Sequence, residues 1–199
     1  MTEKKRCTWG KLLEKDFYRD YHDKEWGVPV HDDRKHYEYL FLESMSCGLS
    51  WELMLKKRDI FRQCFADFDY ETVAGFTEKD IQKIWQTEGM IHSKRKIEGE
   101  IHNAQVFCKT KEEYGSFDQY IWSFTKGKTY IYRSHQNGWV TRNELSDMIA
   151  KDLKSRGFKY VGTVIIYSHL QAIGIINDHN HECFRYKECA EMADVEMKE

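Results

Sequence analysis

Two cysteines and two histidines, divided between the two ends of the chain, carry side chains that could bind a metal ion. Cys7 and His22 lie near the start of the sequence, and His179 and Cys183 lie near its end. The second pair is four positions apart, so one turn of helix would present both side chains together. Two sulfurs and two ring nitrogens suit tetrahedral Zn2+ in a closed, structural site. Chance also produces such pairs among nine histidines and six cysteines, so spacing alone favours an accidental pairing over zinc.

A glycine turn followed by a basic helix start forms a second group. Gly89 and the apolar Ile91 separate two helical patterns, and the second pattern opens with Ser93, Lys94, Arg95 and Lys96. The free N–H groups at a helix start can hold an anion, and basic side chains there suit a phosphate backbone. An ordinary helical hairpin with a solvated basic turn explains the same residues equally well.

Aromatic residues gather around two carboxylates in a third group. Tyr18, Tyr21 and Glu25 share one helical face, whereas Glu43 stands in an apolar stretch and Trp51 follows it. Burying a bare carboxylate is costly, so Glu43 must be paired or functional. Aromatic faces with one carboxylate would suit a flat, electron-poor or cationic ring. Taken singly, each of these residues is better explained by core packing.

The elements that must position these groups are helical. Apolar periodicity, capping residues and glycine stops predict helices over 33–47, from Ser50 onward, and over 78–86, 93–107, 116–124, 144–154 and 162–176. Thr77 with Asp80 resembles a capping box. The stretch 126–142 is expected to form a small hairpin or an irregular loop, and the last dozen residues are expected to fray. The fold class is therefore all-α, with about eight short helices.

Composition narrows the class of protein further. A length of 199 residues fits one domain, and 31 basic against 33 acidic residues identify no polyanionic partner. The longest uncharged run, 160–177, is expected to be a buried core helix and not a membrane span. No apolar signal segment opens the sequence, so a cytoplasmic location with free or metal-bound thiols is expected.

Several strings of residues, in order along the chain, resemble the DNA-3-methyladenine glycosylase I family. They are Cys7-Thr-Trp9, Tyr21-His-Asp-Lys-Glu-Trp-Gly-Val-Pro29, Leu42-Glu43 with Gly48-Leu-Ser-Trp51, Arg156-Gly-Phe-Lys-Tyr-Val-Gly162 and Asn177-Asp-His179. The resemblance extends from about Cys7 to Tyr186, nearly the whole chain.

This resemblance implies a helix–hairpin–helix fold and excision of 3-methyladenine from alkylated double-stranded DNA, which leaves an abasic site. It implies one structural zinc ion on Cys7, His22, His179 and Cys183, joining the two ends of the chain. It assigns Glu43 as the catalytic residue. The base pocket falls on Tyr18, Tyr21, Trp51, Trp9 and Trp26. DNA contacts fall on Leu49, Gly89, Ile91, Ser93, Lys94 and Arg95. Residues 1–186 would form one globular domain, with a hairpin part over about 33–125, a zinc-joined part from about 1–32 and 144–186, and an acidic tail over 187–199. We expect a monomer.

Departures from the family pattern and rival functions leave alternatives open. His181 could compete as a zinc ligand, and residues 45–47 depart from the family pattern after the pocket glutamate. The stretch 126–142 matches the family poorly and supports no site. A non-catalytic module that binds damaged DNA or nucleobases would have a similar sequence. A zinc hydrolase would need three protein ligands and an open position, whereas four ligands are available here.

Overall fold

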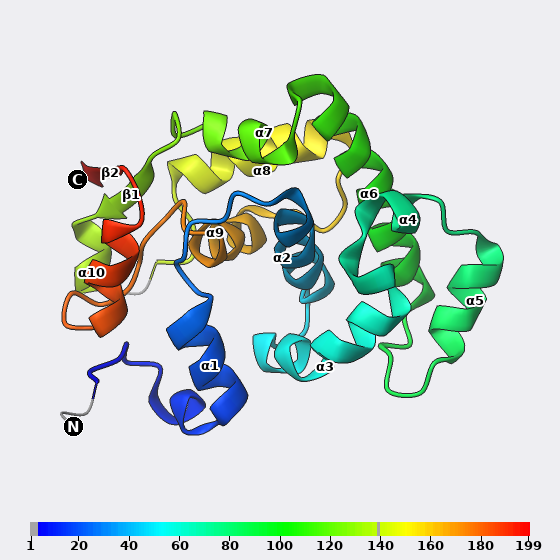
Figure 1. The fold of residues 1–199 in the computed structure, drawn as a ribbon, viewed down its shortest axis with the longest axis horizontal. Coiled ribbons are helices and arrows are strands. Elements are labelled where there is room, and N and C mark those ends of the chain that lie inside the picture. Colours follow the sequence, from blue (N-terminus) through cyan, green and yellow to red (C-terminus); the bar gives the residue numbers. More distant parts are fainter. Residues whose placement is uncertain (1–3, 139) are drawn as a thin grey trace.

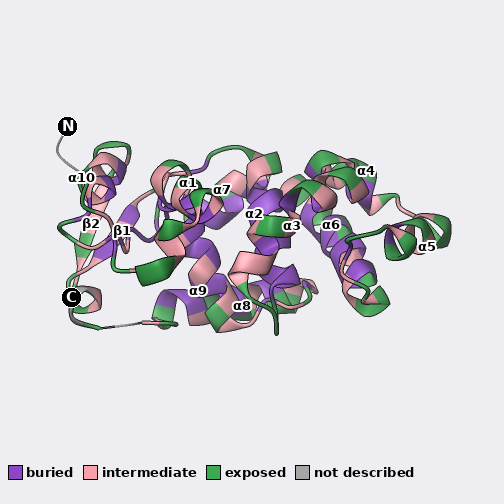
Figure 2. Ribbon diagram, turned by 90° about the horizontal axis from the view of Figure 1, so that it is seen from below, coloured by how far each residue is buried: buried purple, intermediate pink, exposed green. Residues whose placement is uncertain are grey.

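One buried helix, α2 (Asp33–Met45), lies at the centre of the molecule (Figures 1 and 2). Every residue from His36 to Met45 is buried. This confirms the prediction of a buried helix, which was made because apolar residues lie on nearly all faces of this segment. The computed structural model describes residues 4–138 and 140–199. Because α2 is covered all round, the other helices must pack against it from several directions.

The other helices are mostly short. They are α1 (Asp16–Lys24), α3 (Trp51–Cys64), α4 (Tyr70–Ala74), α5 (Glu78–Gln86), α6 (Lys94–Tyr114), α7 (Phe117–Ser123), α8 (Glu144–Arg156), α9 (Thr163–Ala172) and α10 (Phe184–Glu191). Three 3-10 turns, η1 (Gly10–Glu14), η2 (Ala66–Phe68) and η3 (Ser134–Asn137), complete the helical elements of the described residues. α3 to α6 lie at one end of the molecule, and α10 lies with both chain ends at the other (Figure 1).

Polar side chains start these helices where the sequence predicted. The Ser50 hydroxyl accepts a hydrogen bond from the Leu53 N–H at 3.2 Å, and that of Ser116 accepts from the Gln119 N–H at 2.9 Å. Thr77 and Asp80 form the expected capping box of α5. These bonds satisfy N–H groups that a helix leaves without a partner in its first turn. α6 is longer than expected and continues to Tyr114.

A two-stranded parallel sheet corrects two predictions. β1 (Thr129–Tyr132) falls within the stretch where a hairpin or loop was expected, and β2 (Val195–Lys198) falls within the tail expected to fray. The strands pair in register from Thr129 with Val195 to Tyr132 with Lys198. Each strand is only four residues long and they lie far apart in sequence. No local turn signal in the sequence could therefore predict their pairing. The fold is mostly helical, but because it contains this sheet it is not all-α.

The apolar stretch expected as one helix over 162–176 divides into two parts. α9 ends at Ala172, and Ile176 instead forms a single parallel bridge with Tyr130 of β1. Gly174 breaks the helix with a φ of +76°, and its Cα packs so closely on Pro29 that a Cβ would lie 2.5 Å from the Pro29 nitrogen. Within the described part of the chain, none of the helices combines the length and the hydropathy needed to cross a bilayer.

Candidate functional site

A cavity of about 770 Å³ lies among α1, the α2–α3 turn and α9, and His135, Gly138, Val140 and Thr141 also line it. Seven residues that the sequence assigned to the base pocket or to DNA contacts line it: Trp9, Tyr18, Tyr21, Trp26, Glu43, Leu49 and Trp51. They come from three separate stretches of the chain, so the tertiary fold is what brings them together.

Glu43 is the only one of these seven residues with a carboxylate. It is 4% exposed, and among the described residues its side chain has no hydrogen-bond partner. Burial raises the pKa of Glu43 well above its ordinary value, because no nearby cation offsets the loss of hydration. A cationic ligand in the cavity would favour the ionised form of Glu43.

Aromatic rings surround this carboxyl group. Trp9 packs edge-on against Trp26, with ring centroids 4.6 Å apart, and against Tyr18 at 5.8 Å. Tyr21 lies 5.4 Å from Trp51. Burial, assisted by the nearby glutamates, raises the pKa of Tyr18 to about 12, so its hydroxyl stays protonated. The cavity therefore offers flat faces and a protonated hydroxyl beside one carboxyl group.

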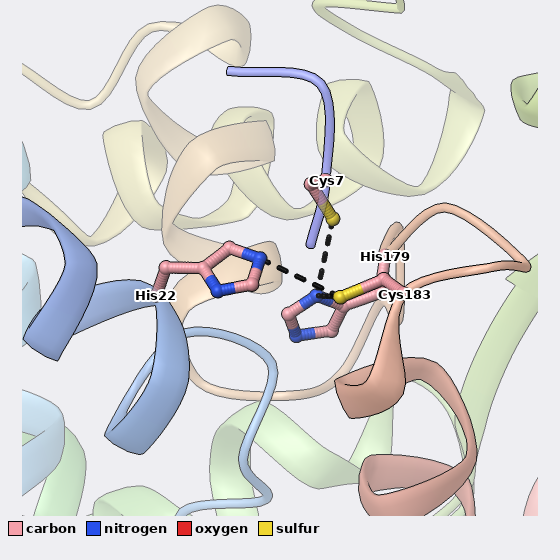
Figure 3. A group of neighbouring side chains, drawn as sticks. All are labelled: Cys7, His22, His179 and Cys183. Carbon is pink, nitrogen blue, oxygen red and sulfur yellow. Dashed lines mark hydrogen bonds between the residues drawn. The ribbon is translucent and has the colours of Figure 1, made fainter. Parts of the chain in front are cut away.

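The side chains of the four predicted ligands lie close together (Figure 3). They are Cys7, His22, His179 and Cys183. All are buried, and their ligand atoms lie within 4.8 Å of one another. The Sγ of Cys183 lies 3.6 Å from both the His22 Nε2 and the His179 Nδ1, and the Cys7 Sγ lies 3.3 Å from that Nδ1. Zinc bonds of about 2.3 Å to sulfur and 2.0–2.1 Å to nitrogen would place such atoms about 3.6 Å apart at tetrahedral angles. The cluster thus has the dimensions to hold a metal ion.

Neighbouring groups orient both imidazoles toward the cluster. The other ring nitrogen of His22 lies 2.8 Å from Asp23, and that of His179 lies 2.9 Å from the Trp26 carbonyl. Such bonds fix the tautomer that leaves the facing nitrogen free for a metal. Gly27 provides the room, because a Cβ there would lie 2.9 Å from the His179 Nε2. The residue set and its supports therefore fit a closed metal site.

Known proteins match this chain over nearly its whole length. The family described as methyladenine glycosylase matches residues 9–186. The DNA-3-methyladenine glycosylase 1 of Escherichia coli (strain K12) is 38% identical over 182 residues, which cover 91% of this chain and 96% of that protein. The chain belongs to the methyladenine glycosylase family.

Solved structures of the family have the same fold. A crystal structure of a 3-methyladenine DNA glycosylase I superposes with a TM-score of 0.83 at 41% identity, covering 90% of this chain and 98% of that one. The Staphylococcus aureus enzyme, solved to explain 3-methyladenine recognition, gives 0.82 at 34% identity over 88% and 97% of the two chains.

One expectation about the cysteine–histidine cluster requires correction, and one alternative left open by the sequence can be addressed. His179 and Cys183 do not share a helical turn: they flank a tight turn in which the Cys183 N–H donates to the Asn180 carbonyl at 2.8 Å. His181 does not join the four ligand residues, and its ring instead packs 4.6 Å from that of Tyr186. The two side chains do lie close together, but a turn and not a helix brings them there.

A polar wall of the cavity was missed from the sequence. The carboxylate of Asp178 accepts hydrogen bonds from the Tyr167 hydroxyl and from the Gln171 amide, the latter at 2.8 Å, and lies 3.0 Å from the His135 Nδ1. All four residues line the cavity. Tyr167 and Gln171 stand at i and i+4 on α9, so their side chains share one face of the helix. That pair of polar positions was the available signal, whereas nothing in the sequence near His135 pointed to the cavity.

The hairpin between α5 and α6 forms where the sequence predicted it. Gly89 lies in the turn, Met90 is buried, and Ile91 is half-buried against the core. Lys94 forms an exposed ion pair with Glu78 at 2.6 Å, and Arg95 is exposed. Two apolar residues, Met90 and Ile91, therefore anchor this turn in the core, and Met90 is the more deeply buried of the two.

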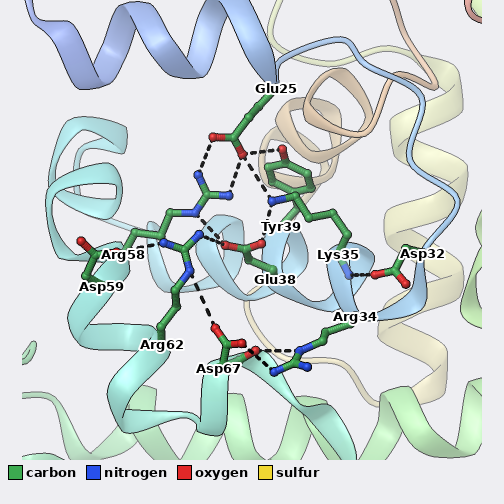
Figure 4. A network of polar contacts seen from close by, with 10 residues as sticks. All are labelled: Glu25, Asp32, Arg34, Lys35, Glu38, Tyr39, Arg58, Asp59, Arg62 and Asp67. Carbon is green, nitrogen blue, oxygen red and sulfur yellow. Dashed lines mark hydrogen bonds and ion pairs between the residues drawn. The ribbon is translucent and has the colours of Figure 1, made fainter.

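A network of charged groups fixes α1, α2 and α3 around the cavity (Figure 4). Arg58 of α3 donates to both oxygens of Glu25, at 2.8 and 2.7 Å, and to Glu38 of α2 at 2.7 Å. Lys35 reaches Glu38 at 2.8 Å. Burial alone would raise the pKa of Glu25, but the hydrogen bonds and charge of Arg58 outweigh it and lower that pKa to about 2.

We predict that Arg58→Met lowers the free energy of unfolding by about 3–5 kcal/mol at pH 7, because it leaves two carboxylates without their shared cation. Lowering the pH from about 4.5 toward 2 should shrink the difference from wild type. Above an unfolded-state pKa near 4.5, the wild-type ion pair is fully present, and it is lost as Glu25 becomes protonated near its folded pKa of about 2.

Urea denaturation at a series of pH values measures both effects. Arg142→Met, which removes an exposed pair with Asp147, is the matched control and should cost no more than about 1 kcal/mol. Equal losses in the two variants would contradict a stabilising role for the Arg58 network.

Proposed function

We propose that this protein is a repair enzyme that flips 3-methyladenine out of double-stranded DNA and hydrolyses its N-glycosidic bond. The observation that carries the proposal is the buried, unpartnered carboxyl group of Glu43 beside the Trp51 ring. Membership of the methyladenine glycosylase family supports the same reaction. The alternative of a non-catalytic module has no observation of its own in its favour.

The reaction needs little acid catalysis. Alkylation at N3 makes the adenine cationic, so the base leaves as a neutral molecule. Water attacks C1′ of the sugar while the C1′–N bond breaks, and the electron pair of that bond goes to the purine. The surplus proton of the water is released to solvent, and an abasic sugar remains. The protein's part is selection, because a damaged base costs less to extract from the duplex than an intact one.

Glu43 and the aromatic rings provide that selection. The carboxylate of Glu43 accepts hydrogen bonds from the edge of the methylated adenine and favours its positive charge. Trp51 stacks on the purine, while Tyr18, Tyr21, Trp9 and Trp26 line the sides of the pocket. The burial of Glu43 supports this role, since a charged ring compensates for the hydration that the carboxylate has lost.

DNA contacts surround the cavity mouth. Leu49 is 40% exposed and lines the cavity, so it can enter the gap that the flipped nucleotide leaves. The hairpin of Gly89, Ile91 and Ser93 presents the N-terminal amides of α6 to a phosphate. Lys94 and Arg95 add positive charge without reading sequence. The α5–α6 hairpin and its basic residues form the helix–hairpin–helix unit of the proposed glycosylase fold, and Leu49 lies on the separate α2–α3 turn.

One structural zinc ion binds to the cluster of Cys7, His22, His179 and Cys183. These four ligands occupy all four coordination positions of the zinc and leave none for a substrate. Its role is to join the two ends of the chain. The short distances among four buried ligand atoms support the assignment. Two thiols this close together could not both ionise without a nearby cation, and a zinc ion supplies that positive charge.

The remaining assignments follow from the same site. The proposed enzyme acts as a monomer. Residues 1–186 form the glycosylase domain, with the hairpin part over about 33–125. A cytoplasmic location suits a DNA substrate and six unpaired cysteines.

We predict that the purified protein releases 3-methyladenine from methylated duplex DNA and binds the free base more tightly than adenine. Glu43→Gln should lose about tenfold or more of that binding, because a hydrogen bond to a charged group contributes about 1.5–3 kcal/mol. Trp51→Ala should lose a stacking energy of about 1–3 kcal/mol. Chromatography of released bases and titration with the two free bases provide the measurements.

Glu112→Gln, an exposed carboxylate on α6, is the matched control and should behave as wild type. No release of base by the wild type would refute the proposed reaction. Equal affinity for the two bases, or no loss in Glu43→Gln, would refute the role of Glu43 in selection.

For the metal we expect one equivalent of zinc per wild-type chain and much less in Cys183→Ser. The variant should also unfold more easily, by more than about 4 kcal/mol, because metal binding is part of folding. Elemental analysis and denaturation with and without a chelator measure the two effects. Cys108→Ser, outside the cluster, should keep both properties. A wild-type zinc content well below one equivalent would exclude a tightly held ion.

For the hairpin we expect Lys94→Ala with Arg95→Ala to weaken binding to all DNA sequences alike. The slope of log K against log salt should become shallower by about 1–2, because each lost phosphate contact contributes about 0.9. Binding titrations at several salt concentrations measure this slope. Lys109→Ala with Lys151→Ala, two exposed positions elsewhere, is the control. An unchanged slope would mean that the basic residues form a merely solvated turn.

A further inference from the structure

Lys96 does not project into solvent with the two basic residues that precede it. It is half-buried, and its ammonium donates to the Met45 carbonyl at 2.5 Å and to the Cys47 carbonyl at 2.7 Å. Sequence analysis grouped Lys96 with Lys94 and Arg95 at a phosphate-binding helix start, and these contacts correct that grouping. An ammonium engaged with the protein's own backbone is not available to a phosphate.

The two carbonyls end α2 and open the turn toward α3. The other carbonyls at this end have partners of their own: Glu43 accepts from the Ser46 hydroxyl at 2.7 Å, and Ser44 from the Cys47 N–H at 3.2 Å. Those of Met45 and Cys47 depend on Lys96. A cation at a helix C-terminus is also favoured by the helix dipole. Lys96 therefore completes the hydrogen bonding of this turn.

The stem of Lys96 is itself held in place. Its ammonium lies 5.5 Å from the centre of the Tyr160 ring. That ring packs so closely on α6 that a Cβ at Gly99 would lie 2.7 Å from it. Burial lowers the pKa of Lys96. The side chain is thus built into the junction between the hairpin helix and the α2–α3 turn.

We propose that Lys96 is a positioning residue that fixes the turn carrying Leu49, and so couples the α5–α6 hairpin to the insertion of Leu49 into DNA. The turn is short: the Leu49 N–H donates to the Ser46 carbonyl at 2.6 Å, and Gly48 reverses the chain with a φ of +77°. Without Lys96, two carbonyls would lose their donor and the turn would change shape. This inference rests on the proposed function, because it assumes that Leu49 replaces a flipped nucleotide.

The decisive comparison is between double-stranded and single-stranded DNA that contain the same 3-methyladenine. A base in a single strand need not be extracted from a duplex, so it needs Leu49 far less. Lys96→Met keeps the length of the side chain but removes the charge and the donors. Its single-turnover excision rate on duplex DNA should fall about tenfold or more. Excision from single strands and affinity for the free base should stay within about twofold of wild type, since Glu43 and Trp51 are untouched.

Matched variants separate positioning from general damage. Lys96→Arg keeps the donors and should restore most of the duplex activity. Lys109→Met removes an exposed lysine from the same helix and should match wild type. Leu49→Ala should show the same duplex-specific loss, and the double variant Lys96→Met with Leu49→Ala should lose less than the product of the single losses.

Equal losses on duplex DNA, single strands and free base would overturn the proposal, because they would assign Lys96 to the pocket itself. Full duplex activity in Lys96→Met would overturn it too. If Lys96→Met does not fold, Lys96→Gln takes its place, and failure of both to fold would assign Lys96 to stability alone. Absence of excision by the wild type would instead count against the proposed function.

Discussion

The structure depends on a carboxyl group held away from water with no partner of its own. Glu43 lies in the most completely buried helix of the protein, and burial raises its pKa because no cation stands nearby. Such a group is costly unless a ligand compensates it. The rings of Trp51, Tyr18 and Tyr21 leave space beside it for a flat molecule. A cationic ligand beside this carboxyl group would offset the hydration that burial removes.

Two arrangements of buried polar groups keep that cavity in shape. The Arg58 network joins α1, α2 and α3, and the cysteine–histidine cluster joins the N-terminal segment to the turn before α10. Each joins residues that lie far apart in the sequence, and each lies next to an aromatic residue of the pocket. Glu25 directly precedes Trp26, and the Trp26 carbonyl contacts His179. A buried ion pair is weak evidence for added stability, because desolvation offsets much of the attraction. What the Arg58 network shows is a direct link between α3, α2 and the residue that ends α1.

The C-terminal strand extends this frame beyond the part shared with the family, which ends at residue 186. β2 pairs with β1, and the Arg133 N–H donates to the Lys198 carbonyl at 3.0 Å. Tyr132 at the end of β1 stacks on His135 at 4.3 Å, and His135 contacts Asp178 in the cavity wall. The last residues of the chain thus support one side of the site through a strand, a stacked ring and a hydrogen bond.

Local sequence patterns predicted most of the helices and their caps, whereas the pocket and cluster residues were proposed from the family resemblance. Ser50, Thr77 and Ser116 act on groups three residues away, and the apolar surroundings of Glu43 lie on its own helix, so short-range pattern was sufficient. The family resemblance then selected among interpretations that spacing left open. Only the tertiary structure decided the β1–β2 pairing, the Asp178 wall and the contacts of Lys96. The strand partners Thr129 and Val195 lie 66 positions apart, His135 and Asp178 lie 43 apart, and Lys96 lies 51 and 49 positions from its two carbonyl partners. No local propensity determines which distant group a side chain will meet.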